Sequence, residues 1–382
     1  MCALTSLELF AGAGGLAKGV ELNGVEHCAF VEWNAPACET LKLNFSPKLV
    51  QHVDVKEYDF GGLGQVDIIA GGPPCQPFSQ GGKHKGETDD RDMFPYACDA
   101  ITKCRPKAFI FENVKGLLRK SFASYFNYII LQLSYPDVVI RAKETWTDHL
   151  SRLERLHTSG ECAGTKYNVV YRLVNAADYG VPQKRERVVI VGIRADLGVE
   201  WAFPAKTHSL ESLLHQQFGS GDYWERHGII EPDVSIYDPQ MSKRISKLKA
   251  QGSMFDLPLR PWPTVRDQLV DVPEPDYAGD FHREHIRRDG AKIYPGHTGS
   301  FIDLPAKTLK AGGHGVPGGE NMIRYHNGDV RYFTTYEAKL MQTFPKDYAI
   351  HGCWTESMRQ IGNAVPVELA RVISGSIVTA GA

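Results

Sequence analysis

The stretch Leu4-Thr-Ser-Leu-Glu-Leu-Phe-Ala-Gly-Ala-Gly-Gly15 decides the fold. A strand predicted over Leu4–Phe10 runs into a glycine-rich turn that opens a helix. Gly12, Gly14 and Gly15 let a ligand approach the backbone and let the helix pack closely. Free N–H groups at the start of a helix favour an anion. For this motif alone, a tight turn without a ligand is the alternative.

The rest of the first 195 residues alternates strand-like and helix-like segments. This rhythm predicts an α/β fold with a mostly parallel, doubly wound sheet. The further strands are predicted at His27–Trp33, Val66–Ala70, Ala108–Glu112, Tyr167–Asn175 and Arg187–Arg194, and helices at Ala35–Asn44 and Pro95–Cys104.

The pattern changes after residue 199. Residues 200–319 are rich in Pro, Gly, His and aromatic residues and have few periodic segments, which predicts a smaller, irregular domain. Helical patterns return at Thr335–Gln342 and Pro366–Val378. We therefore expect a discontinuous large domain of residues 1–199 and 320–382, with a cleft between it and the inserted domain.

Composition excludes several classes of protein. The 382 residues are 42% hydrophobic and 23% charged, which is typical of a globular chain and not of a disordered one. No apolar run is long enough to cross a membrane, and the N-terminus lacks the pattern of a signal peptide. The eight cysteines form no CxxC pair or zinc-like cluster, which favours a reduced cytoplasmic protein without a metal. The net charge of −2 neither indicates nor excludes a nucleic-acid partner.

Three residues at successive strand ends predict an adenosine pocket. Glu32 ends the second predicted strand, where a carboxylate accepts ribose hydroxyls in nucleotide-type sites. Trp33 offers a flat face for a purine. Asp54 could accept from an adenine amine. Each residue taken alone could equally be a solvated surface residue.

Gly71-Gly-Pro-Pro-Cys75 follows a predicted strand directly. Two prolines stiffen the chain before Cys75, and the thiol stands at the carboxyl end of a strand, where such sheets bind ligands. This pattern favours a nucleophilic cysteine over a buried structural one. Glu112, at the end of the next predicted strand, lies where desolvation favours a protonated carboxyl, which could donate as well as accept a hydrogen bond. A structural cap is the alternative for Glu112.

The run Gln183-Lys-Arg-Glu-Arg187 opens the last predicted strand. Strand alternation places Arg185 and Arg187 on one face, where two guanidinium groups make a site for an anion or a carbonyl group. A solvated basic run is the alternative.

Taken in order, these motifs resemble those of the DNA cytosine-5 methyltransferase family, in its prokaryotic restriction-modification form. The motifs are Phe10–Gly15, Pro73–Cys75, Glu112–Val114, Gln183–Arg187 and Gly362–Pro366, with matching flanks at Asn175–Pro182 and Gln342–Pro345. The resemblance covers nearly the whole chain. The exception is roughly residues 200–300, which correspond to the family's variable target-recognition region.

The resemblance implies an S-adenosylmethionine-dependent methyltransferase with a Rossmann-like mixed sheet, an antiparallel last strand and a smaller target-recognition domain. S-adenosyl-L-methionine would be the cofactor and S-adenosyl-L-homocysteine the product. Glu32 would bind the ribose hydroxyls, Trp33 the adenine ring and Asp54 the adenine amine. The full set implied for the cofactor is Phe10, Gly12, Gly14, Gly15, Glu32, Trp33, Asp54, Val55, Pro74, Asn363 and Ala364. Val55 and Met93 replace the family's usual Ile and Leu.

The implied chemistry takes place on a cytosine flipped out of duplex DNA. The Cys75 thiolate would attack C6, which makes C5 nucleophilic enough to take a methyl group. Protonated Glu112 would hold N3 and the exocyclic amine, and Arg187 would hold O2. Arg185 would brace a phosphate or the loop after Cys75.

Two basic segments are candidates for contact with DNA. The loop after Cys75 carries Ser79, Lys83 and Arg91 near the expected phosphates, although an ordinary solvated loop would look the same. The run Lys243–Lys249 fits either the DNA backbone or a solvated helix face.

The resemblance implies that the partner is double-stranded DNA and that the protein acts as a monomer in a prokaryotic cytoplasm. It implies no membrane and no metal. A cognate restriction endonuclease would be encoded nearby. A tRNA cytosine-5 methyltransferase of the same family is one alternative, against which the inserted domain of over a hundred residues argues. A catalytically inactive DNA-binding homologue is another, against which the intact chemical positions argue.

Overall fold

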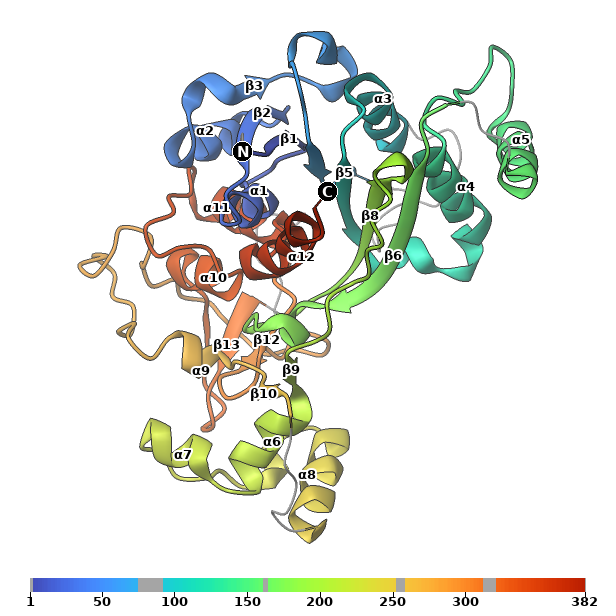
Figure 1. Cartoon of the computed structure of the whole chain (residues 1–382). Helices are drawn as coiled ribbons and strands as arrows, with labels where there is room; N and C mark the ends of the chain where they lie inside the picture. The colour runs from blue at the N-terminus through green and yellow to red at the C-terminus, as the bar shows by residue number, and fades with distance from the viewer. Residues whose placement is uncertain (1–2, 75–91, 161–163, 252–257, 312–320, 382) are drawn as a thin grey trace.

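The computed structural model describes residues 3–74, 92–160, 164–251, 258–311 and 321–381. At its centre is a seven-stranded sheet in the order β3-β2-β1-β4-β5-β8-β6 (Figure 1). The strands from β3 to β5 run parallel, whereas β8 is antiparallel to both of its neighbours. The bounds are β1 (Thr5–Leu9), β2 (Glu26–Glu32), β3 (Val50–His52), β4 (Ile68–Gly71), β5 (Ala108–Val114), β6 (Tyr167–Asn175) and β8 (Glu186–Arg194).

This sheet confirms the predicted doubly wound fold. Its last strand in chain order, β8, is the antiparallel one, and β6 takes the edge position beside it. The chain winds outward from β1 through β2 to β3 and then crosses to β4 on the other side of β1. In open α/β sheets, ligands bind in the crevice at the carboxyl ends of the two strands where the order reverses. Leu9 pairs with Gly71 in the register of β1 and β4, so Phe10 and Gly72 leave the sheet side by side.

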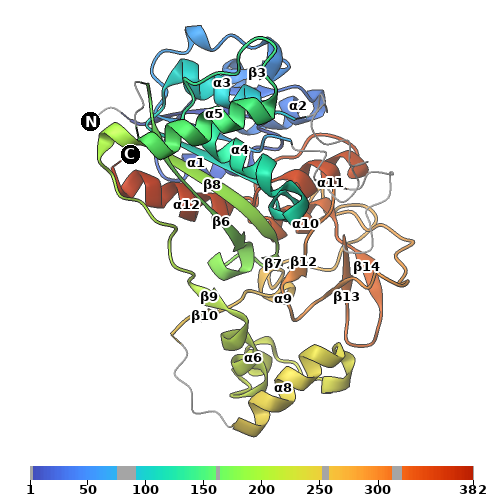
Figure 2. The same ribbon diagram turned by 90° about the vertical axis from the view of Figure 1, so that its right-hand side faces the viewer.

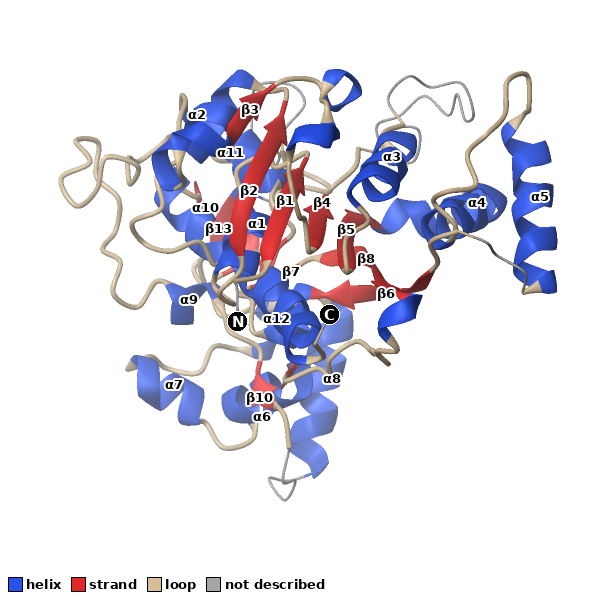
Figure 3. Ribbon diagram, turned by 45° about the horizontal axis from the view of Figure 1, so that its top comes forward, coloured by secondary structure: helices blue, strands red, loops and turns tan. Residues whose placement is uncertain are grey.

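Helices cover both faces of the sheet (Figure 3). The helices of the large domain are α1 (Gly15–Glu21), α2 (Ala35–Asn44), α3 (Phe94–Cys104), α4 (Ala123–Ser134), α5 (Trp146–Ser159), α10 (Thr335–Met341), α11 (Trp354–Asn363) and α12 (Val367–Thr379), of which α5 packs on α4 rather than on the sheet. The predicted helices at 35–44, 95–104, 335–342 and 366–378 are confirmed within one residue at each end. No predicted helix corresponds to α4, α5 or α11.

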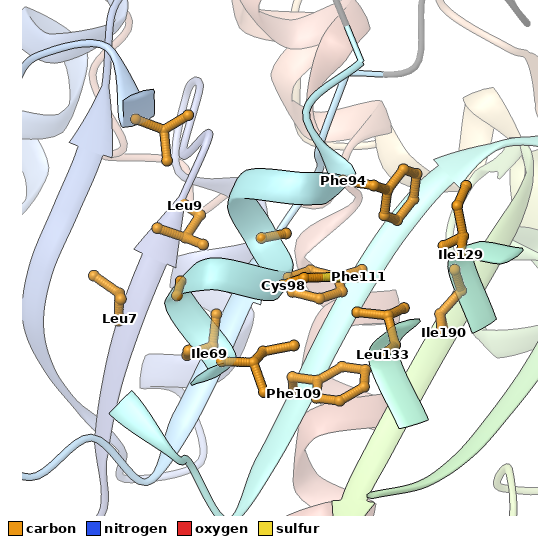
Figure 4. Close-up of a cluster of buried hydrophobic side chains, with 14 of the residues drawn as sticks. Leu7, Leu9, Ile69, Phe94, Cys98, Phe109, Phe111, Ile129, Leu133 and Ile190 are labelled. Atoms are coloured by element: carbon orange, nitrogen blue, oxygen red, sulfur yellow. The ribbon is translucent and has the colours of Figure 1, made fainter. Parts of the chain in front are cut away.

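Two hydrophobic cores hold these layers together. Successive strand residues point to opposite faces, and both faces of the central strands are apolar because helices bury both. Ile69 and Phe109 belong to the core that includes α3 and α4 (Figure 4). Ile68 and Ile110 belong to the other core, which includes α1 and α12. A Cβ atom added at Gly19 of α1 would lie 2.4 Å from Ala370 Cβ, so this glycine allows α1 and α12 to pack closely.

Residues 200–319 contain more regular structure than predicted. The interpretation of an irregular segment was wrong for residues 210–218, 222–227 and 239–251, which form α-helices. The helices here are α6 (Leu210–Phe218), α7 (Asp222–His227), α8 (Pro239–Gln251) and α9 (Val265–Gln268). Short strands complete the region and its surroundings: β7 (Gln183–Lys184), β9 (His208–Ser209), β10 (Arg260–Pro261), β11 (Ser300–Phe301), β12 (Ala306–Lys307), β13 (Met322–Arg324) and β14 (Val330–Tyr332).

The helices α6 and α8 lie beyond one end of the large sheet (Figure 2). Trp224 and Trp262 are buried there in a separate apolar cluster with Phe218 and Ile245. The basic run 243–249 lies on α8, where Ile245 faces this cluster.

Among the described residues, one helical segment, Trp354–Thr379, is long and apolar enough by composition to cross a membrane. It consists of α11 and α12, which are interrupted at Pro366. About three fifths of its most apolar window, 61%, is buried, as in a core helix of a soluble protein. Its apolar residues Ile361, Leu369 and Ile373 belong to the hydrophobic cores.

Candidate active site

The glycine-rich turn leaves β1 with an unusual backbone conformation. Phe10 has a φ of 52° and Gly12 a φ of 54°. A positive φ is uncommon for a residue with a side chain, and such strain is found most often at functional sites. A Cβ atom added at Gly12 would have the carbonyl oxygen of Phe10 at 4.0 Å as its nearest neighbour, whereas one at Gly15 would lie 2.2 Å from the carbonyl oxygen of Val365. Gly12 therefore leaves room beside the turn, and Gly15 serves close packing against the C-terminal segment.

Glu32 ends β2 directly beside this turn. Its Oε2 accepts a hydrogen bond from the Gly12 N–H at 2.7 Å, and its Oε1 accepts one from the Asn34 N–H at 2.7 Å. The residue is only 6% exposed, and burial raises the pKa of the Glu32 carboxyl, against the lowering effect of the two N–H donors. Each carboxylate oxygen keeps a further lone pair for another donor. Trp33, by contrast, is 70% exposed and presents its indole ring to the surroundings.

The Pro-Pro-Cys segment is joined to the end of β5. Asn113 Nδ2 donates to the carbonyl oxygen of Pro73 at 2.9 Å, and Asn113 is itself buried. The carbonyl oxygen of Pro74 accepts from the N–H of Met93 at 3.2 Å, so the residues that flank the loop meet. Cys75, the predicted nucleophile, lies outside the described residues, but its neighbour Pro74 is placed directly at the carboxyl end of β4.

Glu112 and Arg187 form an ion pair at the same end of the sheet. Arg187 Nε lies 2.6 Å from Glu112 Oε1, and both side chains are largely buried. The register of β5 with β8 pairs Val114 with Arg187, which brings the two strands' polar ends together. The proton expected on Glu112 stays a prediction.

Arg185 is 1% exposed and is held by backbone carbonyl groups. Its Nη2 donates to the carbonyl oxygen of Gly362 at 2.9 Å, and its Nη1 donates to that of Leu309 at 3.3 Å. Burial, followed by the charge on Arg187, lowers the pKa of Arg185. A guanidinium group nevertheless stays protonated in proteins, so Arg185 is a buried cation that joins the Gly-Asn-Ala-Val-Pro segment to the strand motif.

One cavity of about 580 Å³ connects all these groups. It lies at the carboxyl ends of β1, β4 and β5, which is the predicted place for a ligand in such a sheet. The predicted residues that line it are Phe10, Gly12, Gly15, Glu32, Trp33, Pro74, Glu112, Arg185, Arg187, Asn363 and Ala364. The structure thus brings the candidate cofactor residues and the candidate catalytic residues into one space.

Some predicted residues lie elsewhere. Gly14 is buried against Tyr348, Leu41 and Phe45 and does not line the cavity. Asp54 accepts a hydrogen bond from the Lys56 N–H at 3.0 Å and caps a short 3₁₀ helix, with the buried Val55 next to it; neither lines the cavity. Three predicted DNA contacts, Ser79, Lys83 and Arg91, lie outside the described residues.

Arg359 also lines the cavity, although it was not among the predicted site residues. Its Nη2 donates to Asn34 Oδ1 at 2.8 Å and to Glu356 Oε1 at 2.6 Å. The sequence offered one signal for Arg359 as a site residue, which is its position three residues before Gly362 of the Gly-Asn-Ala-Val-Pro motif. Within the described ranges, no group of three or more His, Cys, Asp or Glu side chains is placed to hold a metal ion.

A cavity at the point where the strand order reverses, bordered by Pro73 and Pro74, is the type of ligand site that a doubly wound α/β fold provides. The crystal structure of S. pombe Dnmt2 methyltransferase shares this fold, with a TM-score of 0.58 and 17% identity over 98% of both chains. The family model for C-5 cytosine-specific DNA methylase matches residues 4–136 and 147–379, and the chain belongs to this family.

Two relatives agree with this assignment. The chain is 31% identical over 375 residues to the type II methyltransferase M.PspPI of Psychrobacter sp. (strain TA137), covering 97% of this chain and 78% of the relative. It is 30% identical over 378 residues to the type II methyltransferase M.Sau96I of Staphylococcus aureus, covering 97% and 75%.

The chain is therefore a DNA (cytosine-5)-methyltransferase that uses S-adenosylmethionine and acts on DNA. The matches do not favour the tRNA-acting alternative or an inactive homologue. The residues fit the cofactor: Glu32 is a buried acceptor with spare lone pairs, Trp33 is an exposed ring, and the position beside Gly12 is open.

Proposed function

We propose that the cavity of about 580 Å³ is the active site, with S-adenosylmethionine at its Glu32 end and a flipped cytosine at its Glu112 end. One observation carries this proposal: Glu32 and Glu112 line the same cavity, and Pro74, which precedes Cys75, borders it. A methyl donor and a reactive base held there would be neighbours, which is the proximity that methyl transfer needs.

At the cofactor end, Glu32 accepts hydrogen bonds from ribose hydroxyl groups through the lone pairs that Gly12 and Asn34 leave free. Trp33 packs its exposed ring against adenine. Asn363 and Ala364 close the cavity from the C-terminal side. When bound, S-adenosylmethionine supplies an electrophilic methyl group on a sulfonium.

At the cytosine end, the Cys75 thiolate adds to C6 of the base, and the electron pair of the C5–C6 bond moves toward C5. Glu112 binds N3 and the exocyclic amine, while Arg187 holds O2 and keeps the Glu112 side chain in place through their ion pair. C5 then takes the methyl group, and the electrons of the sulfonium–methyl bond stay on the sulfur, which leaves S-adenosylhomocysteine. A base removes the C5 proton, and the Cys75 sulfur departs as C5–C6 unsaturation is restored. Arg185 braces the wall of the site through its bonds to backbone carbonyl groups.

We assign the chemistry to residues 1–199 and 320–382, and the choice of target sequence to residues 200–319. The separate apolar cluster around Trp224 and Trp262 supports a region that can vary without disturbing the sheet. Flipping the target base costs a few kcal/mol, which contacts of the two regions with the DNA backbone would offset. Ser79, Lys83 and Arg91 are assigned to that backbone.

We assign the biological role from the relatives. Because the similar proteins are named type II methyltransferases, we propose that this chain protects host DNA in a restriction-modification system. It would act as a monomer in a prokaryotic cytoplasm, with a restriction endonuclease of the same target sequence encoded nearby.

Transfer of tritiated methyl groups from S-adenosylmethionine to duplex DNA tests the reaction. After digestion to nucleosides, the label is expected in 5-methylcytosine. Label in N4-methylcytosine would contradict the assignment of Cys75 and Glu112, and equal or faster labelling of tRNA would contradict the substrate.

A further inference from the structure

A tyrosine far along the chain touches the glycine-rich turn. The hydroxyl group of Tyr348 donates a hydrogen bond to the carbonyl oxygen of Ala13 at 2.6 Å, and Tyr348 is only 3% exposed. Ala13 lines the cavity and precedes Gly14, the residue that caps α1. A Cβ atom added at Gly14 would lie 2.5 Å from the same hydroxyl group. The hydroxyl group therefore packs tightly against the turn as well as bonding to it.

Tyr348 is held in place by a buried ion pair. Lys339 Nζ donates to the carbonyl oxygen of Tyr348 at 2.7 Å and also lies 2.7 Å from Glu284 Oε2. The other oxygen of Glu284 accepts from the N–H of Ile350 at 3.0 Å. Lys339 is 0% exposed, so its charge depends on this carboxylate. The two residues hold the backbone from the carbonyl group of Tyr348 to the N–H of Ile350, and Glu284 comes from the segment assigned to DNA recognition.

The turn needs such a restraint. Phe10, Gly12 and Gly14 have φ values of 52°, 54° and 78°, all in the left-handed region. A strained conformation persists only where its surroundings enforce it. Gly12 is held from one side by Glu32, and Tyr348 holds the other side through Ala13.

We infer that Tyr348 is a positioning residue for the cofactor site: its hydroxyl group keeps the glycine-rich turn in the conformation that binds S-adenosylmethionine, and the Glu284–Lys339 pair keeps Tyr348 in place. The inference rests on the proposed location of the cofactor in this cavity. It gives a role to residues outside all the motifs that define the active site.

The expected change in Kd follows from the fraction of molecules in which the turn has the binding conformation. If loss of one hydrogen bond lets the turn leave the binding conformation most of the time, the apparent Kd rises by the inverse of the remaining competent fraction. A neutral hydrogen bond of ordinary strength corresponds to a change of about threefold to tenfold. Tyr348→Phe removes only the hydroxyl group and keeps the ring that packs on Phe344 and Phe45.

Tyr167→Phe is the matched control. The Tyr167 hydroxyl group also donates to a backbone carbonyl group, that of Pro106, at 2.6 Å, and Tyr167 is 1% exposed. Its bond lies at the opposite end of the sheet from the cavity. Both variants lose one buried hydroxyl group, so a purely structural role predicts similar changes in thermal unfolding and no selective change in cofactor binding.

The experiment measures S-adenosylmethionine binding to the full chain by calorimetry, with thermal unfolding of each variant recorded in parallel. We expect Tyr348→Phe to raise the Kd by about threefold to tenfold and Tyr167→Phe to leave it unchanged. Equal Kd values for the two variants would overturn the inference. Glu32→Ala distinguishes failure of this inference from failure of the proposed cofactor site. If Glu32→Ala leaves cofactor affinity unchanged, the assignment of the cofactor to this cavity is wrong. If Glu32→Ala weakens cofactor binding but Tyr348→Phe does not, only the role of Tyr348 is refuted.

Glu284→Gln is the second variant, and it tests whether Tyr348 positions the turn even if Tyr348→Phe does not fold. It keeps the Tyr348 hydroxyl group and most of the shape of the Glu284 side chain while removing the charge that pairs with Lys339. We expect the Kd to rise in the same direction by about twofold to fivefold. A Kd equal to that of the wild-type chain would show that the clamp does not position the turn.

Discussion

Replacing Glu32 with alanine removes a buried carboxyl group from the cofactor site. The side chain is 6% exposed, and its two oxygens accept N–H groups of Gly12 and Asn34 at 2.7 Å each. Alanine removes the acceptors for the ribose hydroxyl groups and also releases Gly12 from one side of the strained turn. Hydrogen bonds to a charged group contribute about 1.5–3 kcal/mol each, and part of this is recovered by water. We expect a loss of about 1–3 kcal/mol in binding, which is about fivefold to 150-fold in Kd.

Calorimetric titration with S-adenosylmethionine measures this change directly. Glu32→Gln keeps one acceptor oxygen and should give an intermediate Kd. Glu39→Ala is the control, because Glu39 is an exposed acid on α2 whose partner is Lys42. Affinity for DNA without cofactor should change little in all three variants. A folded Glu32→Ala protein with a Kd within about twofold of the wild-type value would refute the reasoning.

Four further results are expected. Duplex DNA carrying 5-fluorocytosine should trap a denaturant-stable adduct with the wild-type chain and none with Cys75→Ala, since the fluorine blocks release from C5; an equal adduct with the variant would contradict the role of Cys75. Glu112→Gln should lower kcat by about 100-fold to 1,000-fold with a smaller effect on cofactor Kd, and an unchanged kcat would remove Glu112 from the chemistry. Burial lowers the pKa of His149 from its usual 6.5, so the folded chain takes up the proton less readily than the unfolded chain. The contribution of neutral His149 to the free energy of unfolding is therefore present above pH 6.5 and is lost as the pH falls toward the lowered pKa. Chemical denaturation from pH 8 to pH 5 should therefore show a shallower loss of stability for His149→Gln, and identical slopes would contradict this. Grafting residues 200–310 onto a related methyltransferase should transfer the target sequence, and an active chimera that keeps its old target would assign recognition to another region.

The predicted parts of the fold depend on short-range patterns. β1 and its turn follow from an apolar run that ends in glycines, and α2 follows from the helix-like segment at residues 35–44 between two strand-like runs. The shared position of Glu32 and Glu112 was also predictable, because the carboxyl ends of parallel strands meet at one edge of a sheet.

The features that sequence reasoning missed depend on contacts between distant segments. No local pattern indicates that Tyr348 reaches Ala13, or that Glu284 pairs with Lys339. Close packing was predicted for Gly14 and is found against Tyr348. Contact with the cofactor was also predicted, but Gly14 does not line the cavity.

Bisulfite sequencing of host DNA tests the central claim most directly. The chain would be expressed in a bacterial strain without cytosine-5 methylation, beside the Cys75→Ser variant as a control. With the wild-type chain, we expect cytosines to resist conversion at one position of a single recurring sequence, and with the variant we expect full conversion. Complete conversion with an expressed, folded wild-type chain, or resistant cytosines at the same positions with the variant, would contradict the claim that this chain methylates C5 of cytosine through Cys75.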